Sequence, residues 1–416
     1  MIANERRKSF ELTSLFVFVA SIIASAGNYL FQILMGRIMS AENYGSLYAV
    51  LSITNIAMIV GSTAATAIAK NIAEKQIYDK ASEKKVMTGN AVLQAGIGVA
   101  TFIILFVIGY GITLALVGAI AVLSTNIAIS WYGLAQGKKA FVIVAVYNLV
   151  QPITKVAMAV PLVKAGVPYP IVFIVMTVSA ITSIIICHFM LTRANKSIEE
   201  KECNNLFSDT RKTFAASVIP MIALSVYSNV HVIAFEKLAG GAEAGAFSIA
   251  AVFGNALLYI PSAIAVVLVP FVAEANNKKQ RVLLIKSLLY SESLAALCAI
   301  MLILLRKPVL SLLFGSNGEA AEPYLLPICI MAFPIIAIFV MTNYLIAKGE
   351  SKFLNIVGIS SFVLLAIGMV FTQENMFAML IFVTGLYTVT ALSLIIKEII
   401  NYVKERNNGL LCGDNG

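Results

Sequence analysis

The sequence predicts an all-α polytopic membrane protein of about twelve transmembrane helices, in two six-helix lobes related by a parallel internal repeat. Of the 416 residues, 60% are hydrophobic and 12% are charged, whereas soluble domains are about half apolar and a quarter charged. The mean hydropathy is +0.90. The apolar residues form runs of about 20, long enough for a helix to cross a hydrocarbon core of about 30 Å. Such runs exclude the alternating strands, about ten residues long, of a membrane barrel.

The repeat joins two segments in the same direction, residues 36–74 and residues 236–274. Each reads as a short basic turn, a glycine, a long apolar helix and a polar exit. Aligned without a gap, the identical pairs include Gly45 with Gly245, Asn55 with Asn255, Ser62 with Ser262, Ala65 with Ala265, and Ala73-Glu74 with Ala273-Glu274. The second half of the chain is therefore predicted to repeat the first.

Twelve apolar spans follow one another along the chain. They are predicted at 13–36, 44–69, 87–109, 112–134, 141–163, 169–191, 214–235, 245–272, 287–305, 324–347, 353–371 and 376–396. Only Gly109-Tyr110-Gly111 separates the third from the fourth. A basic start and Ala24-Ser25-Ala26 also resemble a cleaved signal peptide. The apolar run continues past that site, however, and the repeat needs it as a helix.

The charged segments predict the orientation. With the N-terminus in the cytoplasm, 24 of the 30 Lys and Arg fall in cytoplasmic segments. Five lie outside, namely Arg37, Lys164, Lys237, Arg306 and Lys307. The positive-inside bias thus places both termini in the cytoplasm of a cell-membrane protein. The polar stretch 192–212 is interpreted as a linker between an N-terminal lobe (1–202, helices 1–6) and a C-terminal lobe (203–416, helices 7–12, with a cytoplasmic tail).

Polar residues recur at helical spacing inside several spans. The candidates for a polar, substrate-binding lumen are Asn28, Gln32, Asn55, Asn148, Gln151, Lys155, Asn229 and Asn255. Polar groups in hydrocarbon face a protein interior or a water-filled cavity. The alternative is that Ser, Thr and Asn only hold neighbouring helices together.

Lys155 is the one cation deep within a span. It either extends to the outer surface or lines a cavity that attracts an anionic substrate. Pro152, one turn earlier, is expected to kink or loosen the helix. Glu292 and His231 are candidates for coupling to Na+ or H+, with an interfacial carboxylate and a packing histidine as the alternatives.

Several classes of function lack support in the sequence. The basic residues lie between apolar runs, which disfavours binding of nucleic acid. The five cysteines form no disulfide framework, and two histidines provide no metal cluster. The sequence contains no Walker loop, no HExxH and no nucleophile elbow, so neither an enzyme nor a cofactor is expected.

Three stretches carry a resemblance to a known family. They are Gly36–Tyr48 after the first helix, Gly245–Pro261 with Pro270-Phe271, and Pro308–Gly315 followed by Ala320–Leu326. In this order they resemble the polysaccharide transporters, a branch of the multidrug/oligosaccharidyl-lipid/polysaccharide exporter superfamily. The resemblance covers nearly the whole chain.

The resemblance implies two lobes around a central cavity that opens alternately to either side. It also implies flipping of a polyprenyl-diphosphate-linked oligosaccharide for surface polysaccharide biosynthesis. Membrane lipids and a glycan polymerase or ligase are the implied partners. The chain departs from lipid II flippases, which have more helices and several lumen arginines.

Two other functions stay open. A cation-coupled multidrug or metabolite antiporter of the same superfamily is the alternative transporter, although the first two spans carry no acidic residue. A scaffold for envelope assembly that transports nothing is the third hypothesis.

Overall fold

The computed structural model describes residues 2–75, 80–194, 205–261, 264, 268, 271–272, 277–372 and 375–412. Within these ranges the regular secondary structure is helical, and twelve helices are long and apolar enough to cross a membrane. The predicted fold class is confirmed. The predicted lobe boundary at 202/203 lies outside the described residues, as do Ser262, Ala265, Ala273, Glu274 and Pro270.

The first lobe holds six spans. Its elements are α1 (Ile2–Ile38), α2 (Ala41–Lys75), α3 (Lys80–Val107), α4 (Ile112–Gly137), α5 (Phe141–Thr154), the π-helical turn η1 (Lys155–Ala159), α6 (Val160–Lys164) and α7 (Ile171–Ala194). α5, η1 and α6 together form the fifth span. The short turn between α3 and α4 is confirmed, because Gly109 and Gly111 take φ values of +97° and +74° that favour glycine.

The second lobe holds the other six spans and two short helices. Its elements are α8 (Leu206–Ala239), α9 (Gly241–Leu257), α11 (Asn277–Leu304), α12 (Arg306–Phe314), α13 (Ser316–Glu319), α14 (Glu322–Ala347), α15 (Ser351–Thr372) and α16 (Met376–Cys412). The predicted linker is too long at its second end, since α8 already begins at Leu206. Burial explains the early start: Leu206 packs in the core of the first lobe, and the Phe207 ring fills the space beside Gly89.

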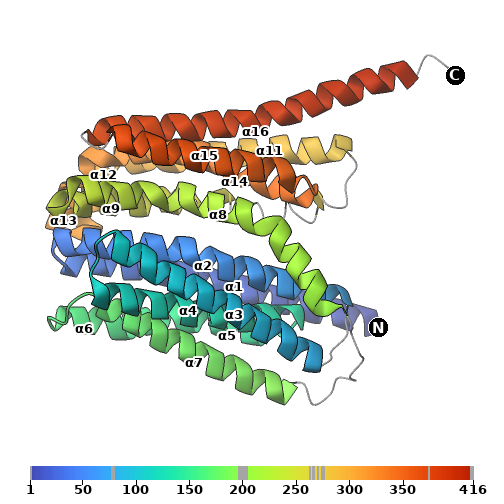
Figure 1. Cartoon of the computed structure of the whole chain (residues 1–416), viewed down its shortest axis with the longest axis horizontal. Helices are drawn as coiled ribbons and strands as arrows, with labels where there is room; N and C mark the ends of the chain where they lie inside the picture. Colours follow the sequence, from blue (N-terminus) through green and yellow to red (C-terminus); the bar gives the residue numbers. More distant parts are fainter. Residues whose placement is uncertain are drawn as a thin grey trace.

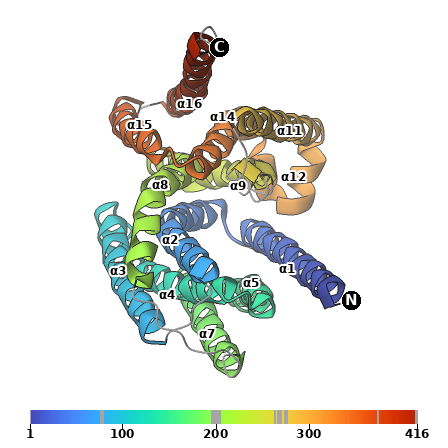
Figure 2. The ribbon, with the colours of Figure 1, turned by 90° about the vertical axis from the view of Figure 1, so that its right-hand side faces the viewer.

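The helices run roughly side by side, and both chain ends lie at the same end of the bundle (Figure 1). Viewed from that end, α2, α8 and α9 lie between the two groups of helices (Figure 2). α2 packs on α8 and α9 of the second lobe as well as on α4 of its own. These three helices therefore form most of the contact between the lobes.

At the end of the bundle away from the termini, the repeated glycines meet. A Cβ on Gly45 would lie 2.7 Å from the backbone N of Gly245, and a Cβ on Gly245 would lie 2.0 Å from the carbonyl O of Ala41. No side chain fits between the backbones at these distances. Residues that the repeat makes equivalent thus touch each other and close this end, which we call the glycine joint.

Polar contacts from the second lobe surround the glycine joint. Asn317 Nδ2 donates to the carbonyl oxygens of Gly36 and Met39, both at 2.9 Å, and so caps the end of α1. Arg37 donates to the carbonyl of Leu312 at 3.1 Å.

Glu236 adds a second set of contacts there. It accepts hydrogen bonds from Ser46 at 3.4 Å and from Tyr110 at 2.9 Å. Burial and the Glu236 carboxylate together raise the pKa of Tyr110, which therefore stays a neutral donor. The two lobes are joined at this end by hydrogen bonds as well as by close backbone packing.

The opposite end of the second lobe is held by charges. Glu398 of α16 is buried and accepts hydrogen bonds from Tyr344 at 2.8 Å and from Lys348 at 3.0 Å. Lys348 also pairs with Glu350, which in turn accepts from Lys397. Burial opposes the charge of Lys348, but these hydrogen bonds raise its pKa. The network ties α14, α15 and α16 together.

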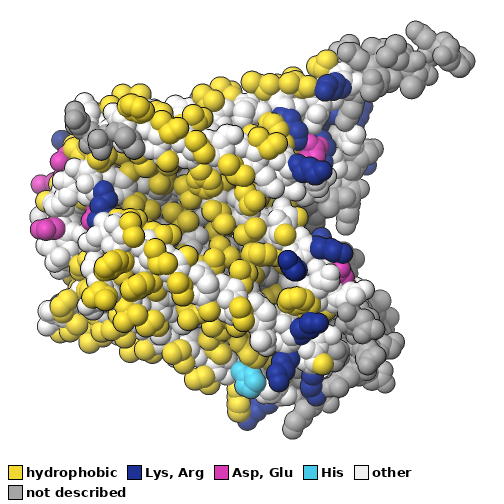
Figure 3. Space-filling view, in the orientation of Figure 1, with side chains coloured by type: hydrophobic (Ala, Val, Ile, Leu, Met, Phe, Trp, Pro, Cys, Tyr) yellow, Lys and Arg dark blue, Asp and Glu magenta, His cyan; other side chains and the backbone are white. Residues whose placement is uncertain are grey.

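The outer surface is apolar along the middle of the molecule, while Lys and Arg gather toward the end that holds the termini (Figure 3). The exposed apolar side chains include Val99, Ile185, Leu289, Ile367 and Ile381. Such a band with a basic end is typical of a helical membrane protein.

The glycine joint can be tested by crosslinking. Ser46→Cys and Glu236→Cys, in a chain freed of its own cysteines, should react with a short bifunctional thiol reagent. Adding Gly245→Val should lower the yield several-fold, because overpacking costs about 1–3 kcal/mol. The control is Gly96→Val, since a Cβ there meets no atom within 4 Å. Equal yields in the two valine variants would contradict the close backbone contact.

Candidate functional site

A polar cluster lies between α1 and α5. Lys155 Nζ donates to Asn28 Oδ1 at 3.3 Å, and Asn148 Nδ2 donates to Ser21 Oγ at 3.1 Å. Asn28 Nδ2 donates to the carbonyl of Ala24 at 3.1 Å, which leaves its Oδ1 to face the lysine. The structure thus brings together three predicted site residues, Asn28, Asn148 and Lys155, from two helices.

The helix is interrupted where Lys155 stands. Proline lacks an N–H and disrupts helical hydrogen bonding, and the π-helical turn η1 begins three residues after Pro152. The expected loosening of the helix at Pro152 is confirmed. Gly27 packs against this proline, with a Cβ position 2.8 Å from Pro152 Cβ. This close approach brings α1 near enough for Asn28 to reach Lys155.

Two glutamines extend the cluster and have unpaired atoms. Gln151 precedes Lys155 by one helical turn, and Gln32 follows Asn28 by one turn. Within the part of the chain that the structure describes, buried Gln151 Nε2 and buried Gln32 Oε1 have no hydrogen-bond partner. A buried polar atom without a partner is costly. One donor and one acceptor are therefore free for water or for a ligand.

The cluster continues into the second lobe through tyrosines. Tyr29, next to Asn28, donates a hydrogen bond to the carbonyl of Val252 on α9, and its ring lies 5.9 Å from that of Tyr259. Asn255 of α9 donates to the hydroxyl of Tyr48 on α2 at 3.0 Å. Asn255 thus lies at the contact between the lobes.

Sequence reasoning missed Tyr29 and Tyr48. The only signal for Tyr29 was its place beside Asn28. For Tyr48 it was its place at the end of the stretch Gly36–Tyr48, which resembles the polysaccharide transporters. Neither position shows which helix of the other lobe the hydroxyl meets.

One face of α2 carries Asn55, Ser62 and Thr66, of which Asn55 and Thr66 are exposed. α2 is otherwise surrounded by α3, α4, α8 and α9. Because α2 is surrounded by other helices, the exposure of the Asn55 and Thr66 side chains indicates an open space along this face of α2, between the lobes. Asn55 therefore borders that space with its side chain.

The other three predicted residues make their described contacts away from Lys155, although His231 lines a small cavity together with Asn255. Asn229 is 8% exposed and donates to the carbonyl of Ser225 on its own helix at 2.8 Å. His231 is 3% exposed and packs edge-on against the Phe247 ring. Glu292 is half-buried on α11, which packs on α9, α12 and α14. Their roles remain predictions.

Metal-binding groups of three or more His, Cys, Asp or Glu do not occur among the described residues. The cluster instead offers one cation, several amides and tyrosine hydroxyls. Such groups suit an anionic ligand that also carries many hydroxyls.

Solved structures with the same fold are transporters. One is a multidrug resistance MATE family transporter of the MOP superfamily in its inward-facing conformation, with a TM-score of 0.71 and 10% identity over 94% of this chain and 99% of that chain. Another is the lipid II flippase MurJ in an inward closed conformation, with a TM-score of 0.67 and 13% identity over 96% and 91%. A third is a mutant of the Vibrio cholerae MATE transporter VcmN, with a TM-score of 0.64 and 12% identity over 95% and 96%.

The chain has twelve helices long and apolar enough to span a membrane, and it shares its fold with these solved transporters. Residues 13–276 match the model of the polysaccharide biosynthesis protein family, and the chain belongs to that family. The suspected polysaccharide-transporter branch is confirmed. Family and fold support a flippase or exporter of lipid-linked glycans in general. A search of curated proteins found no match.

Thiol labelling distinguishes a watery lumen from lipid. Asn55→Cys and Thr66→Cys should react quickly with a charged thiol reagent that cannot cross membranes. Val99→Cys should react at least about tenfold more slowly although Val99 is 60% exposed, because hydrocarbon disfavours the reactive thiolate. Asn229→Cys is the buried control. Equal rates at positions 55 and 99 would contradict a space filled with water.

Proposed function

We propose that this protein moves a polyprenyl-diphosphate-linked oligosaccharide across the cytoplasmic membrane by alternating access, for surface polysaccharide biosynthesis. The observation that carries the proposal is the cluster of Lys155, Asn28, Gln151 and Gln32. It holds one cation and two unpaired amide atoms within the membrane-spanning region. In this proposal the lysine binds the diphosphate and the amides bind sugar hydroxyls, while the lipid tail stays in the bilayer.

The absence of an acidic partner supports this assignment. Lys155 donates a hydrogen bond to the neutral amide of Asn28, and no ion pair among the described residues includes this lysine. A cation that is not neutralised by the protein attracts an anionic substrate. A cationic drug would instead be repelled by it, so the cluster favours the glycan over the antiporter alternative.

The direction of movement follows from the two ends of the bundle. In the proposal, the basic end with both termini faces the cytoplasm, and the end with the glycine joint faces outward. The outer contacts at Gly45, Gly245 and Asn317 are closed, while Asn55 and Thr66 border the interlobe space. The described state is then one that accepts substrate from the cytoplasmic side, and transport requires these outer contacts to separate.

Coupling to Na+ or H+ stays a proposal within this scheme. Glu292 and His231 lie outside the polar cluster, so an ion bound there would act through helix movement rather than by contact with substrate. No motif for ATP use occurs in the sequence. A gradient of ions or of the substrate itself is the proposed driving force.

Cells that lack the protein test the proposal. Lipid-linked oligosaccharide should accumulate in the inner leaflet, where an impermeant sugar-reactive reagent added outside cannot reach it. Cationic drug efflux should be unchanged. If the lipid-linked oligosaccharide kept its normal distribution between the leaflets and drug efflux were lost, the antiporter would be favoured. If cells carrying variants of the lumen residues still exported the glycan fully, the scaffold would be favoured.

Variants of Lys155 locate the site. Lys155→Ala should lower glycan export at least about tenfold, since a charge-assisted hydrogen bond contributes about 1.5–3 kcal/mol. Lys155→Arg should keep part of the activity because it keeps the charge. Lys164→Ala, an exposed lysine at the end of α6, is the control and should export normally. Wild-type export by Lys155→Ala, at equal protein levels, would remove this lysine from the substrate site.

A further inference from the structure

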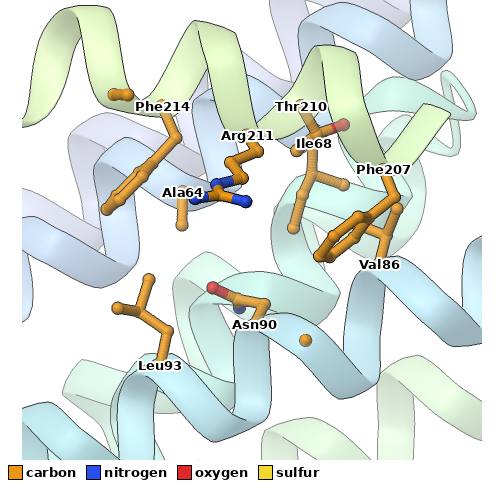
Figure 4. A pocket seen from close by; sticks show the side chains of 11 residues that line it. Ala64, Ile68, Val86, Asn90, Leu93, Phe207, Thr210, Arg211 and Phe214 are labelled. Carbon is orange, nitrogen blue, oxygen red and sulfur yellow. The ribbon is translucent and has the colours of Figure 1, made fainter. Parts of the chain in front are cut away.

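A cavity lies away from the polar cluster, between α2, α3 and α8 (Figure 4). Its volume is about 350 Å3, and most of its lining is apolar, including Ala64, Ile68, Leu93 and Phe214. We call it the α3–α8 groove. Neither the lumen residues nor the glycine joint lines it.

A cation enters this apolar groove. Arg211 extends from α8 into the space between α8 and α3, above Leu93 and Asn90 (Figure 4). No carboxylate is among the lining residues, and the described contacts include no ion pair for Arg211. The carboxylate nearest to Arg211 in sequence is that of Asp209, and its Oδ1 lies 3.9 Å from Lys212 Nζ. The exposed Arg211 guanidinium thus has no carboxylate partner among the described residues, and it remains able to pair with an external anion.

A second observation comes from the neighbouring residue. Thr210 is 8% exposed and lines the same groove. Its buried Oγ1 finds no hydrogen-bond partner within the described ranges. The Thr210 hydroxyl is thus a buried polar group without a described partner on the same turn of α8 as Arg211.

The groove lies where a lipid head group would lie. Arg211 is close to the start of α8, at the basic end of the bundle, and the apolar part of the helix follows it from Phe214 onward. Lys85 on α3 lies 5.7 Å from the ring centre of Phe207, beside the groove. Arginines and lysines at this depth attract anionic lipid phosphates.

We propose that the α3–α8 groove binds an anionic phospholipid of the surrounding bilayer. The lipid phosphate accepts hydrogen bonds from the Arg211 guanidinium, and an acyl chain lies along Leu93 and Ala64. Charge complementarity selects an anionic over a zwitterionic lipid, whose own ammonium would remain near the arginine. This proposal for the α3–α8 groove is independent of which substrate the lumen transports.

A bound lipid would also affect the packing of the two lobes against each other, because the groove lies between α3 and α8. α8 belongs to the second lobe, and it packs on α3 of the first lobe through Phe207 beside Gly89. A lipid bound in the groove would therefore contact both α3 of the first lobe and α8 of the second.

Native mass spectrometry of the purified full-length protein tests the proposal. Wild type, titrated with phosphatidylglycerol or phosphatidylcholine, should hold one phosphatidylglycerol at least about tenfold more tightly, as expected for charge-assisted hydrogen bonds. Arg211→Gln should lose this preference, and Arg211→Lys should retain most of it. Ala215→Phe, which fills the groove from an exposed position, should lose the bound lipid.

The matched control is Arg193→Gln. Arg193 is also an exposed arginine at the basic end, but it lies on α7 with its guanidinium 4.0 Å from the Phe189 ring centre. This variant should bind phosphatidylglycerol as wild type does. An unchanged lipid preference in Arg211→Gln would overturn the proposal. So would displacement of the bound phosphatidylglycerol by an equal amount of polyprenyl phosphate, which would assign the groove to the substrate.

Discussion

The contact on which the architecture depends is the close packing of two backbones at Gly45 and Gly245. Only glycine allows α2 and α9 to approach this closely, with a Cβ position on Gly245 just 2.0 Å from the carbonyl of Ala41. The two glycines are equivalent in the repeat, and their contact holds the lobes together at the end of the bundle away from the termini. On the central helix α2, the side chains of Asn55 and Thr66 remain exposed.

α1 connects this joint to the candidate site. Its end is capped by Asn317 from the second lobe, while its middle packs on α5 at Gly27 and Pro152. Asn28 and Tyr29 are adjacent, yet one bonds Lys155 in the first lobe and the other bonds α9 in the second. Separation of the lobes must therefore move α1 relative to one of them, and with it the surroundings of Lys155. The π-helical turn after Pro152 offers a place where α5 can adjust.

Much of this fold could be predicted from the sequence, because hydropathy acts within one helix at a time. The twelve spans, the Gly109–Gly111 turn and the loosening at Pro152 all depend on local chemistry. The helices α12 and α13 were missed because they are too short to carry a clear apolar pattern. The start of α8 was missed because it depends on Phe207 packing against Gly89 in the other lobe.

The candidate site was less predictable for the same physical reason. Asn55 and Asn229 are the same residue type on adjacent helices, yet Asn55 is exposed and Asn229 bonds its own backbone. Spacing along a helix tells which residues share a face, but not which neighbour covers that face. Arg211 was counted only as a basic linker residue, because nothing in the sequence indicates that α3 lies opposite.

The most direct test of the account uses the purified protein in liposomes with a fluorescent polyprenyl-diphosphate oligosaccharide and a quencher added outside. Wild type should expose the inner-leaflet pool to the quencher, whereas Lys155→Ala should behave almost like empty liposomes. Equal quenching in wild-type and empty liposomes, over a range of ion gradients, would contradict the claim that this protein flips lipid-linked glycans.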